Sequence, residues 1–174
     1  MATHGLFRYR IQKFWDDEFK NLSYINESFN DDVKTHEWLA LGYANKFTGS
    51  MCDMRSPQPS WNQQFIDLFA RNGWNNIGTS YYRMSPGTIL PTHSDTYKKY
   101  ISIFDLQGKE HTIHRAIVFL EDWKPGHYGE YCGEPLTNWT AGDTIEWCYD
   151  TPHMAANLGP EHRYTLQITG NTAS

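Results

Sequence analysis

The segment Arg163–Thr169 reads RYTLQIT and alternates between polar and apolar side chains at every position. Because successive side chains of a β-strand point to opposite faces, this alternation predicts a strand with one polar face and one apolar face. The polar face carries Arg163, Thr165, Gln167 and Thr169. Such a face suits the wall of a polar cavity better than a packed core. The segment therefore predicts a strand that packs on a core and lines a cavity.

Six other β-favouring runs precede this strand, and turns rich in glycine and proline separate them. They are IGTSYYRM (77–84), TILPTH (88–93), YISIF (100–104), TIHRAIVFL (112–120), TIEWCY (144–149) and HMAAN (153–157). Many short strands without intervening helices are typical of a β-sandwich or barrel, and a double-sheet jelly roll suits their number. We therefore predict a mainly β core over residues 75–170.

Residues 1–74 predict helices and loops that brace one sheet of this jelly roll. Ser60-x-x-Gln63 is a capping-box pattern, and Gly73 is placed to end the helix that follows it. The apolar positions on one face of this helix are Trp61, Phe65, Leu68 and Phe69. Weaker helical periodicity covers residues 14–22 and 33–41, and SMCDMRSPQPS (50–60) predicts a loop.

The bulk properties exclude several classes of protein. A length of 174 residues favours a single domain, 1–174. The net charge of −5 and the scattered basic residues argue against a nucleic-acid partner. The longest apolar run, Ala116–Leu120, is too short for a bilayer span, and the N-terminal residues show no secretory signal. Three widely spaced cysteines fit reduced thiols and a cytoplasmic location, while the oligomeric state stays open.

A candidate metal site begins at His93 and Asp95, which lie two residues apart and share a face if they continue a strand. One such pair carries little weight in a chain with 8 histidines and 20 acidic residues. Among the other histidines, His153 is best placed to complete a set, because it begins the run HMAAN. Two histidines and one carboxylate form the facial triad that binds non-haem Fe(II). Glu146 is a weaker candidate for the carboxylate.

Arg163 lies ten residues beyond His153 and two before Thr165. A guanidinium matches a carboxylate with two parallel hydrogen bonds, and a hydroxyl two residues away can complete the grip. The pair is therefore suited to hold the distal carboxylate of a dicarboxylic oxo-acid whose other end chelates the metal.

From YYRMSPGTILPTHSD (81–95) to DTPHMAANLGPEHRYTLQI (150–168), the sequence resembles the Fe(II)/2-oxoglutarate-dependent dioxygenases. The resemblance is greatest to the aspartyl/asparaginyl β-hydroxylase group, which includes free-proline hydroxylases. Pro86-Gly87-Thr88 matches the turn of that group before its first metal histidine. The spacing from His153 to Arg163 matches its distal histidine and co-substrate arginine.

The resemblance implies a double-stranded β-helix fold with His93, Asp95 and His153 as iron ligands and Arg163 as the anchor for 2-oxoglutarate. It also implies co-substrate contacts at Tyr82 and at His114. The implied activity uses dioxygen to hydroxylate an amino acid, free or within a peptide, and releases succinate and CO2. This chain departs from the group at Thr112, where the group has arginine, and in a longer segment before that strand.

Two other functions remain open on the sequence. Gly87-x5-His93-x-Asp95 and His153-x3-Asn157 are similar to fragments of the cupin motifs, which favour a metal- or ligand-binding module without turnover. A zinc hydrolase using the same three ligands is the third hypothesis, although it gives Arg163 and Thr165 no task.

For the remaining histidines and for three tryptophans, the sequence predicts only exposure or a place in a pocket wall. We expect five histidines to be solvated: His4, His36, His111, His127 and His162. Three tryptophans are candidates to line a substrate pocket: Trp38, Trp61 and Trp147. Substrate specificity is expected in the N-terminal third and in two loops, SMCDMRSPQPS (50–60) and KPGHYGEYCGE (124–134).

Overall fold

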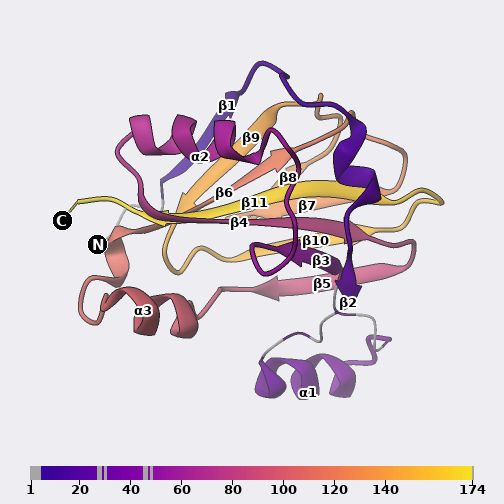
Figure 1. Ribbon diagram of the computed structural model, residues 1–174. Helices are drawn as coiled ribbons and strands as arrows, with labels where there is room; N and C mark the ends of the chain where they lie inside the picture. The colour runs from indigo at the N-terminus through magenta and orange to yellow at the C-terminus, as the bar shows by residue number, and fades with distance from the viewer. Residues whose placement is uncertain (1–4, 27–28, 30, 45–46, 48, 174) are drawn as a thin grey trace.

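The structure is a computed structural model that describes residues 5–26, 29, 31–44, 47 and 49–173. Within these residues, the strands form two antiparallel sheets that pack against each other (Figure 1). The larger sheet has the order β1 (Leu6–Arg10), β9 (Asp143–Cys148), β6 (Ile113–Phe119), β11 (Arg163–Asn171), β4 (Asn75–Met84), β3 (Ser50–Asp53) and β2 (Ile25–Asn26). The smaller sheet has the order β5 (Thr88–His93), β10 (His153–Asn157), β7 (His127–Tyr131) and β8 (Glu134–Leu136). The mainly β jelly-roll prediction is confirmed.

β11 lies at the centre of the larger sheet and has the predicted two faces. Thr165 lies opposite Tyr82 on β4 and Phe119 on β6, so these three side chains share one face of the sheet. Leu166 and Ile168 point to the other face and are fully buried there. The polar side chains of β11 consequently face the space between the two sheets.

Helix α2 (Asn62–Arg71) covers the outer face of the larger sheet, while β5, α1 (Asp32–Ala40) and α3 (Lys98–Phe104) lie on the opposite side (Figure 1). The helix packs because Phe65 and Phe69 are buried in one cluster with the outer face of β11. Gly73 follows it with φ +86°, as the sequence predicts.

The predicted capping box of α2 does not form. Trp61 occupies the N-cap position and makes no side-chain capping bond. The hydroxyl of Ser60 instead donates to the carboxylate of Glu18, 2.8 Å away, next to the 3₁₀ helix η1 (Asp17–Asn21). The hydroxyl therefore joins two segments of the chain rather than capping the helix.

The N-terminal part supplies strands to the larger sheet as well as helices. η1 and α1 overlap the two segments with weaker helical periodicity. The segment 50–60 is not all loop, because β3 takes its first four residues and pairs with β4. β1, which no sequence pattern indicated, pairs with β9 as an edge strand that is mostly exposed.

The run YISIF (100–104) was predicted as a strand and forms most of helix α3. A short apolar run fits either structure, and the flanking backbone decides between them. Tyr97 and Asp105 bracket the helix in the left-handed region, with φ of 50° and 52°. Tyr100 and Ile101 then pack against a small core that contains Tyr97. A 3₁₀ turn, η2 (Glu110–Thr112), follows before β6.

The segment KPGHYGEYCGE (124–134) was predicted as a loop and forms β7, a tight turn and the start of β8. Cys132 and Gly133 are the two turn residues, with φ of 53° and 77°. Two successive positive φ angles match the twist of a two-residue hairpin.

An aromatic cluster fills one end of the space between the sheets. Its members come from both sheets and from the loop before β9: Ile117, Phe119, Tyr131, Trp139, Ile145 and Trp147. Three of its members, Ile117, Tyr131 and Trp147, also line one of the cavities described below. No helix in the described part of the chain is long and apolar enough to cross a membrane.

We predict that Gly142→Ala lowers the free energy of unfolding by about 3 kcal/mol. Gly142 has φ +95°, and a Cβ there would overlap the carbonyl oxygen of Ile11. Gly142 also donates to the Phe119 carbonyl oxygen, 2.8 Å away, so the clash would strain the corner that holds β6.

Gly133→Ala is the matched control, because Gly133 also has a positive φ but a Cβ at this position would meet no atom within 4 Å. It should cost only about 1 kcal/mol. Urea denaturation of the two variants measures the difference. Equal losses would contradict the proposed backbone contact.

Candidate metal centre

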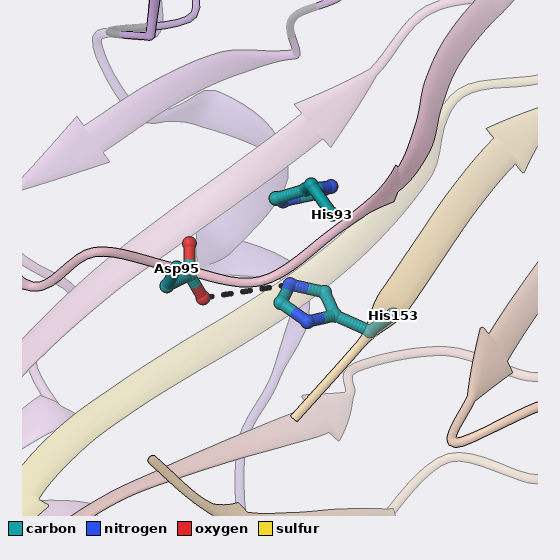
Figure 2. Close-up of side chains that lie close together, drawn as sticks. All are labelled: His93, Asp95 and His153. Carbon is teal, nitrogen blue, oxygen red and sulfur yellow. Dashed lines mark ion pairs between the residues drawn. The ribbon is translucent and has the colours of Figure 1, made fainter. Parts of the chain in front are cut away.

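His93, Asp95 and His153 come together between the two sheets. One ligand atom from each lies within 4.8 Å of the others, and this is the single such group in the part of the chain that the structure describes. His93 ends β5 and lies opposite His153, which begins β10. Asp95 lies two residues past the end of β5. Figure 2 shows its carboxylate facing the ring of His153, where Oδ2 and Nε2 are 3.4 Å apart.

A bulge in β5 gives His93 its direction. Leu90 lies opposite Ala155 on β10, and a regular ladder would then place Thr92 opposite His153. The register shifts by one residue between the Leu90–Ala155 pair and His153, so His93 rather than Thr92 lies opposite His153. An extra residue turns the following side chain to the other face, and Pro91 is suited to a bulge because it has no N–H. Thr92 is exposed, whereas His93 is buried.

The two imidazoles are held in the same way. Nδ1 of His93 lies 2.7 Å from the carbonyl oxygen of Pro91, and Nδ1 of His153 lies 2.9 Å from that of Thr151. A carbonyl oxygen can only accept, so each Nδ1 carries the proton and donates it. Each Nε2 then keeps its lone pair for a metal ion.

The charge states of the three groups also suit a cation. Burial lowers the pKa of both histidines, that of His153 to about 4, so both rings are neutral at pH 7. Burial acts to raise the pKa of Asp95, but the charge of Arg115, the histidines in their protonated forms and the hydrogen bond from Arg115 outweigh it, so the net pKa is lowered. The cluster therefore offers two neutral nitrogens and one carboxylate, the set that divalent iron accepts.

Arg115 fixes the carboxylate of Asp95, and sequence reasoning did not select it. Its Nη1 donates to Oδ2 of Asp95, its Nε donates to the Thr169 hydroxyl 3.3 Å away, and its guanidinium lies 4.5 Å from the Tyr97 ring centre. Asp95 belongs to no strand, so this contact orients its carboxylate. The signal in the sequence is an arginine inside β6, whose other residues apart from His114 are apolar.

Arg163 is buried without a counter-ion among the residues that the structure describes. Only 5% of the residue is exposed, and its Nε has no hydrogen-bond partner within the same set. Its guanidinium lies 5.6 Å from the ring of Phe119 and 5.3 Å from that of Trp139. Burial lowers its pKa. An unpaired buried cation is costly, so this position is suited to a bound anion.

One cavity of about 270 Å³ joins the metal cluster to Arg163. Thr165 and Tyr82, which lie opposite each other on β11 and β4, also line it. Apolar walls come from Ile117, Tyr131 and Trp147. The cavity thus combines a metal-binding cluster, a cationic anchor and several other polar groups with apolar walls, which is the usual composition of a small-molecule site.

The structure does not bring His114 to this cavity. Side chains alternate along β6, and Arg115 and Ile117 take the inner face. His114 points to the other face, where it packs 5.5 Å from the Trp74 ring and lies 3.5 Å from a carboxylate oxygen of Glu146. His114 therefore does not line the cavity where a co-substrate contact was expected. Glu146 lies outside the cavity as well.

The expectation that five histidines are solvated holds for some of them and fails for one. His36, His111 and His162 are exposed as expected, and His4 lies outside the described residues. The expectation for His127 is wrong: it is 2% exposed, and its Nε2 lies 3.1 Å from the carbonyl oxygen of Glu161. A single carbonyl partner allows the neutral ring to be buried, and burial lowers its pKa.

The three tryptophans also take different places. Trp147 lines the cavity, and Trp38 on α1 packs edge-on against His93 with ring centres 5.9 Å apart. Trp61 instead lies in the outer core under α2, against Phe65 and Tyr81. The cysteines Cys52, Cys132 and Cys148 are all free thiols.

Comparisons with known proteins show which solved structures share this fold. No protein-family model matches the sequence, and no curated protein matches it. Among solved structures, a prolyl-4-hydroxylase from Pseudomonas putida is similar with a TM-score of 0.59 and 14% identity, over 99% of this chain and 95% of that one. The non-heme, α-ketoglutarate-dependent carbocyclase SnoK from nogalamycin biosynthesis has a TM-score of 0.57 and 11% identity, over 98% and 80%. At these identities the likeness establishes a shared fold.

We predict that Asp95→Ala and His153→Ala each weaken metal binding by about 100-fold or more, because each removes one of three ligands. Anaerobic titration with Fe(II), or with Co(II) as a coloured probe, measures the affinity. The exposed His162 provides the control, and His162→Ala should bind metal as the parent does. Unchanged affinity in both ligand variants would show that the cluster is not a metal site.

Arg115→Met should weaken the same binding by about 10-fold or more, because Asp95 loses the group that orients it. Arg115→Lys keeps a donor and should recover part of the affinity. Arg8→Met is the matched control, since Arg8 pairs with Glu134 at the surface. Tighter metal binding by Arg115→Met would indicate that the guanidinium only competes for the carboxylate.

Proposed function

We propose that this protein is an Fe(II)- and 2-oxoglutarate-dependent oxygenase that hydroxylates an amino acid, free or within a peptide, and releases succinate and CO2. The observation that carries the proposal is the buried guanidinium of Arg163, which has no counter-ion among the described residues and lies in the same cavity as His93, Asp95 and His153. A metal-binding cluster and an anion site inside one small cavity fit a ligand with a chelating end and a carboxylate end.

The donor set fits iron. The neutral Nε2 atoms of His93 and His153 and the Asp95 carboxylate would occupy one face of the ion and leave its other positions open. When bound, the iron would supply the activation of dioxygen that couples oxidation of 2-oxoglutarate to oxidation of the substrate. Arg115 would hold the Asp95 carboxylate in the orientation that a metal ligand needs.

The anchor fits the co-substrate. Arg163 would pair with the distal carboxylate of 2-oxoglutarate through its fork of N–H donors. Thr165, two residues along the same face of β11, and Tyr82 opposite it would add hydroxyl groups. The rings of Phe119 and Trp139, which stack 4.1 Å apart on one side of the guanidinium, limit the access of water to this pair, which strengthens it.

The competing functions account for fewer of these groups. A zinc hydrolase would use the three ligands to activate water but would leave a buried cation without a partner. A cupin-like module would bind metal without turnover. Metal analysis of protein purified without oxygen separates zinc from iron. Succinate formation from 2-oxoglutarate separates turnover from binding alone.

The finer assignment rests on the resemblance to the aspartyl/asparaginyl β-hydroxylase group. Pro86 and Gly87 form the turn between β4 and β5, with Gly87 at φ +77°, and Thr88 begins β5. The Gly87 N–H donates to the Asn157 carbonyl oxygen 2.8 Å away, which ties this turn to β10. This turn supports membership of that group as part of the proposal.

We predict that Arg163→Met raises the KM for 2-oxoglutarate by about 100-fold, the usual cost of losing one partner of a buried ion pair. Fe(II) affinity without 2-oxoglutarate should not fall, because Arg163 does not belong to the ligand cluster and its loss removes a positive charge from the cavity. Succinate release at varied 2-oxoglutarate concentration measures the first quantity and anaerobic titration the second.

Arg71→Met, at an exposed position on α2, is the control for loss of an arginine and should leave both quantities unchanged. If Arg163→Met formed succinate with the parent KM, the co-substrate site would lie elsewhere and the proposal would fail. The absence of any succinate from iron-loaded parent protein across the twenty amino acids and short peptides would favour the binding module.

A further inference from the structure

A second cavity of about 790 Å³ adjoins the metal centre on its other side. It shares three wall residues with the first cavity: Asp95, Arg115 and Gln167. The remaining wall comes from the N-terminal end of α1, from the end of β3 and from α3 with the loop before it. A molecule in this cavity would therefore lie beside Asp95 without displacing anything bound at Arg163.

The strand register shows how the two cavities connect. Along the inner face of β11, Thr165 pairs with Tyr82, Gln167 pairs with Ser80, and Thr169 pairs with Gly78. The first pair lines the cavity of Arg163, and the last pair lines the second cavity. At about 3.4 Å per residue, Arg163 and Thr169 are about 20 Å apart along the strand. The metal centre lies between these two ends.

The floor of the second cavity is polar. Ser80, Gln167 and Thr169 place two hydroxyl groups and one amide on the inner face of the sheet. Gly78 completes the floor, and a Cβ at this position would meet no atom within 4 Å. The floor therefore combines hydrogen-bonding groups with open space above Gly78, where a bound molecule can lie.

Charged groups of both signs surround this floor. They are Asp31, Asp32, Asp53, Arg55, Lys98 and Lys99. Asp53 and Arg55 pair with each other, 2.8 Å apart, and the arginine side chain is 60% exposed. The remaining charged residues of the wall, Asp31, Asp32, Lys98 and Lys99, thus offer partners for a cationic and for an anionic group of one ligand.

We propose that the second cavity receives the molecule to be oxidised and selects a small polar zwitterion, a free amino acid, over a residue within a peptide. This inference rests on the proposed function. A peptide residue has lost both of its α-charges and cannot use a wall of mixed charge.

Paired substrates test the selectivity. Succinate release is measured with each of the twenty free amino acids and with its N-acetyl amide, which mimics a peptide residue. At least one free amino acid should stimulate release with a kcat/KM about 10-fold or more above that of its blocked form. Equal or better use of the blocked form, or no stimulation by any free amino acid, would overturn the inference.

Filling the cavity tests its location. Gly78→Leu places a side chain in open space and should lower amino-acid-stimulated succinate release by about 10-fold or more. Anaerobic binding of Fe(II) and 2-oxoglutarate should persist, which also shows that the variant folds. Gly78→Val is a second variant with a side chain favoured in strands. Ala70→Leu, exposed on α2 beyond the far face of the sheet, is the matched control.

The outcomes separate the two proposals. If the parent protein binds neither Fe(II) nor 2-oxoglutarate, the proposed function fails. If the parent binds both and uses a free amino acid, but Gly78→Leu and Gly78→Val match Ala70→Leu in stimulated release, only the placement of the substrate in the second cavity is overturned.

Discussion

The register between β5 and β10 is the constraint on which the candidate site depends. One extra residue in β5, at Pro91 and Thr92, turns His93 to the inner face and sets it opposite His153. Without that bulge the same strand would present Thr92 to the cavity, because a slip of one residue exchanges the two faces. Both imidazoles then use the same short contact, an Nδ1 proton donated to the carbonyl two residues earlier, so the backbone of the smaller sheet sets both ring directions.

The larger sheet supplies the groups that the smaller sheet lacks. Asp95 lies beyond the end of β5 and is not held by strand pairing. Arg115, on β6 of the opposite sheet, donates a hydrogen bond to its carboxylate. Arg163 begins β11 on that same sheet. The site is therefore complete only when the two sheets pack, and the aromatic cluster at one end of the interface, which includes Trp139 and Trp147, maintains that packing. Folding stability and site geometry share this interface.

The sequence predicts the features that depend on residue type and on the alternation of polar and apolar residues. It does not predict which face of an apolar strand a given side chain takes, or where the backbone adopts a left-handed conformation. β11 was readable because its polar and apolar positions alternate without interruption. The run containing His114 and Arg115 is apolar on both faces apart from these two residues, so it does not show which of them points inward. YISIF became helix α3 because left-handed residues flank it, and no apolar pattern shows that. His127 is buried through a carbonyl partner 34 residues away, which only the tertiary fold provides.

The net charge of the side chains in the cavity links binding at the metal cluster to binding at Arg163. The two histidines are neutral, and the charges of Asp95 and Arg115 cancel, so Arg163 leaves the cavity with an uncompensated positive charge. A divalent cation alone would add to that charge in a poorly solvated space, which is unfavourable. A dicarboxylate that reaches both the cation and Arg163 removes the penalty for each. Because linkage between two ligands is reciprocal, the metal and the dicarboxylate should each strengthen the binding of the other. The guanidinium of Arg163, which lacks a counter-ion among the described residues, is thus the feature that makes the cavity a site for two ligands together rather than for a metal ion alone.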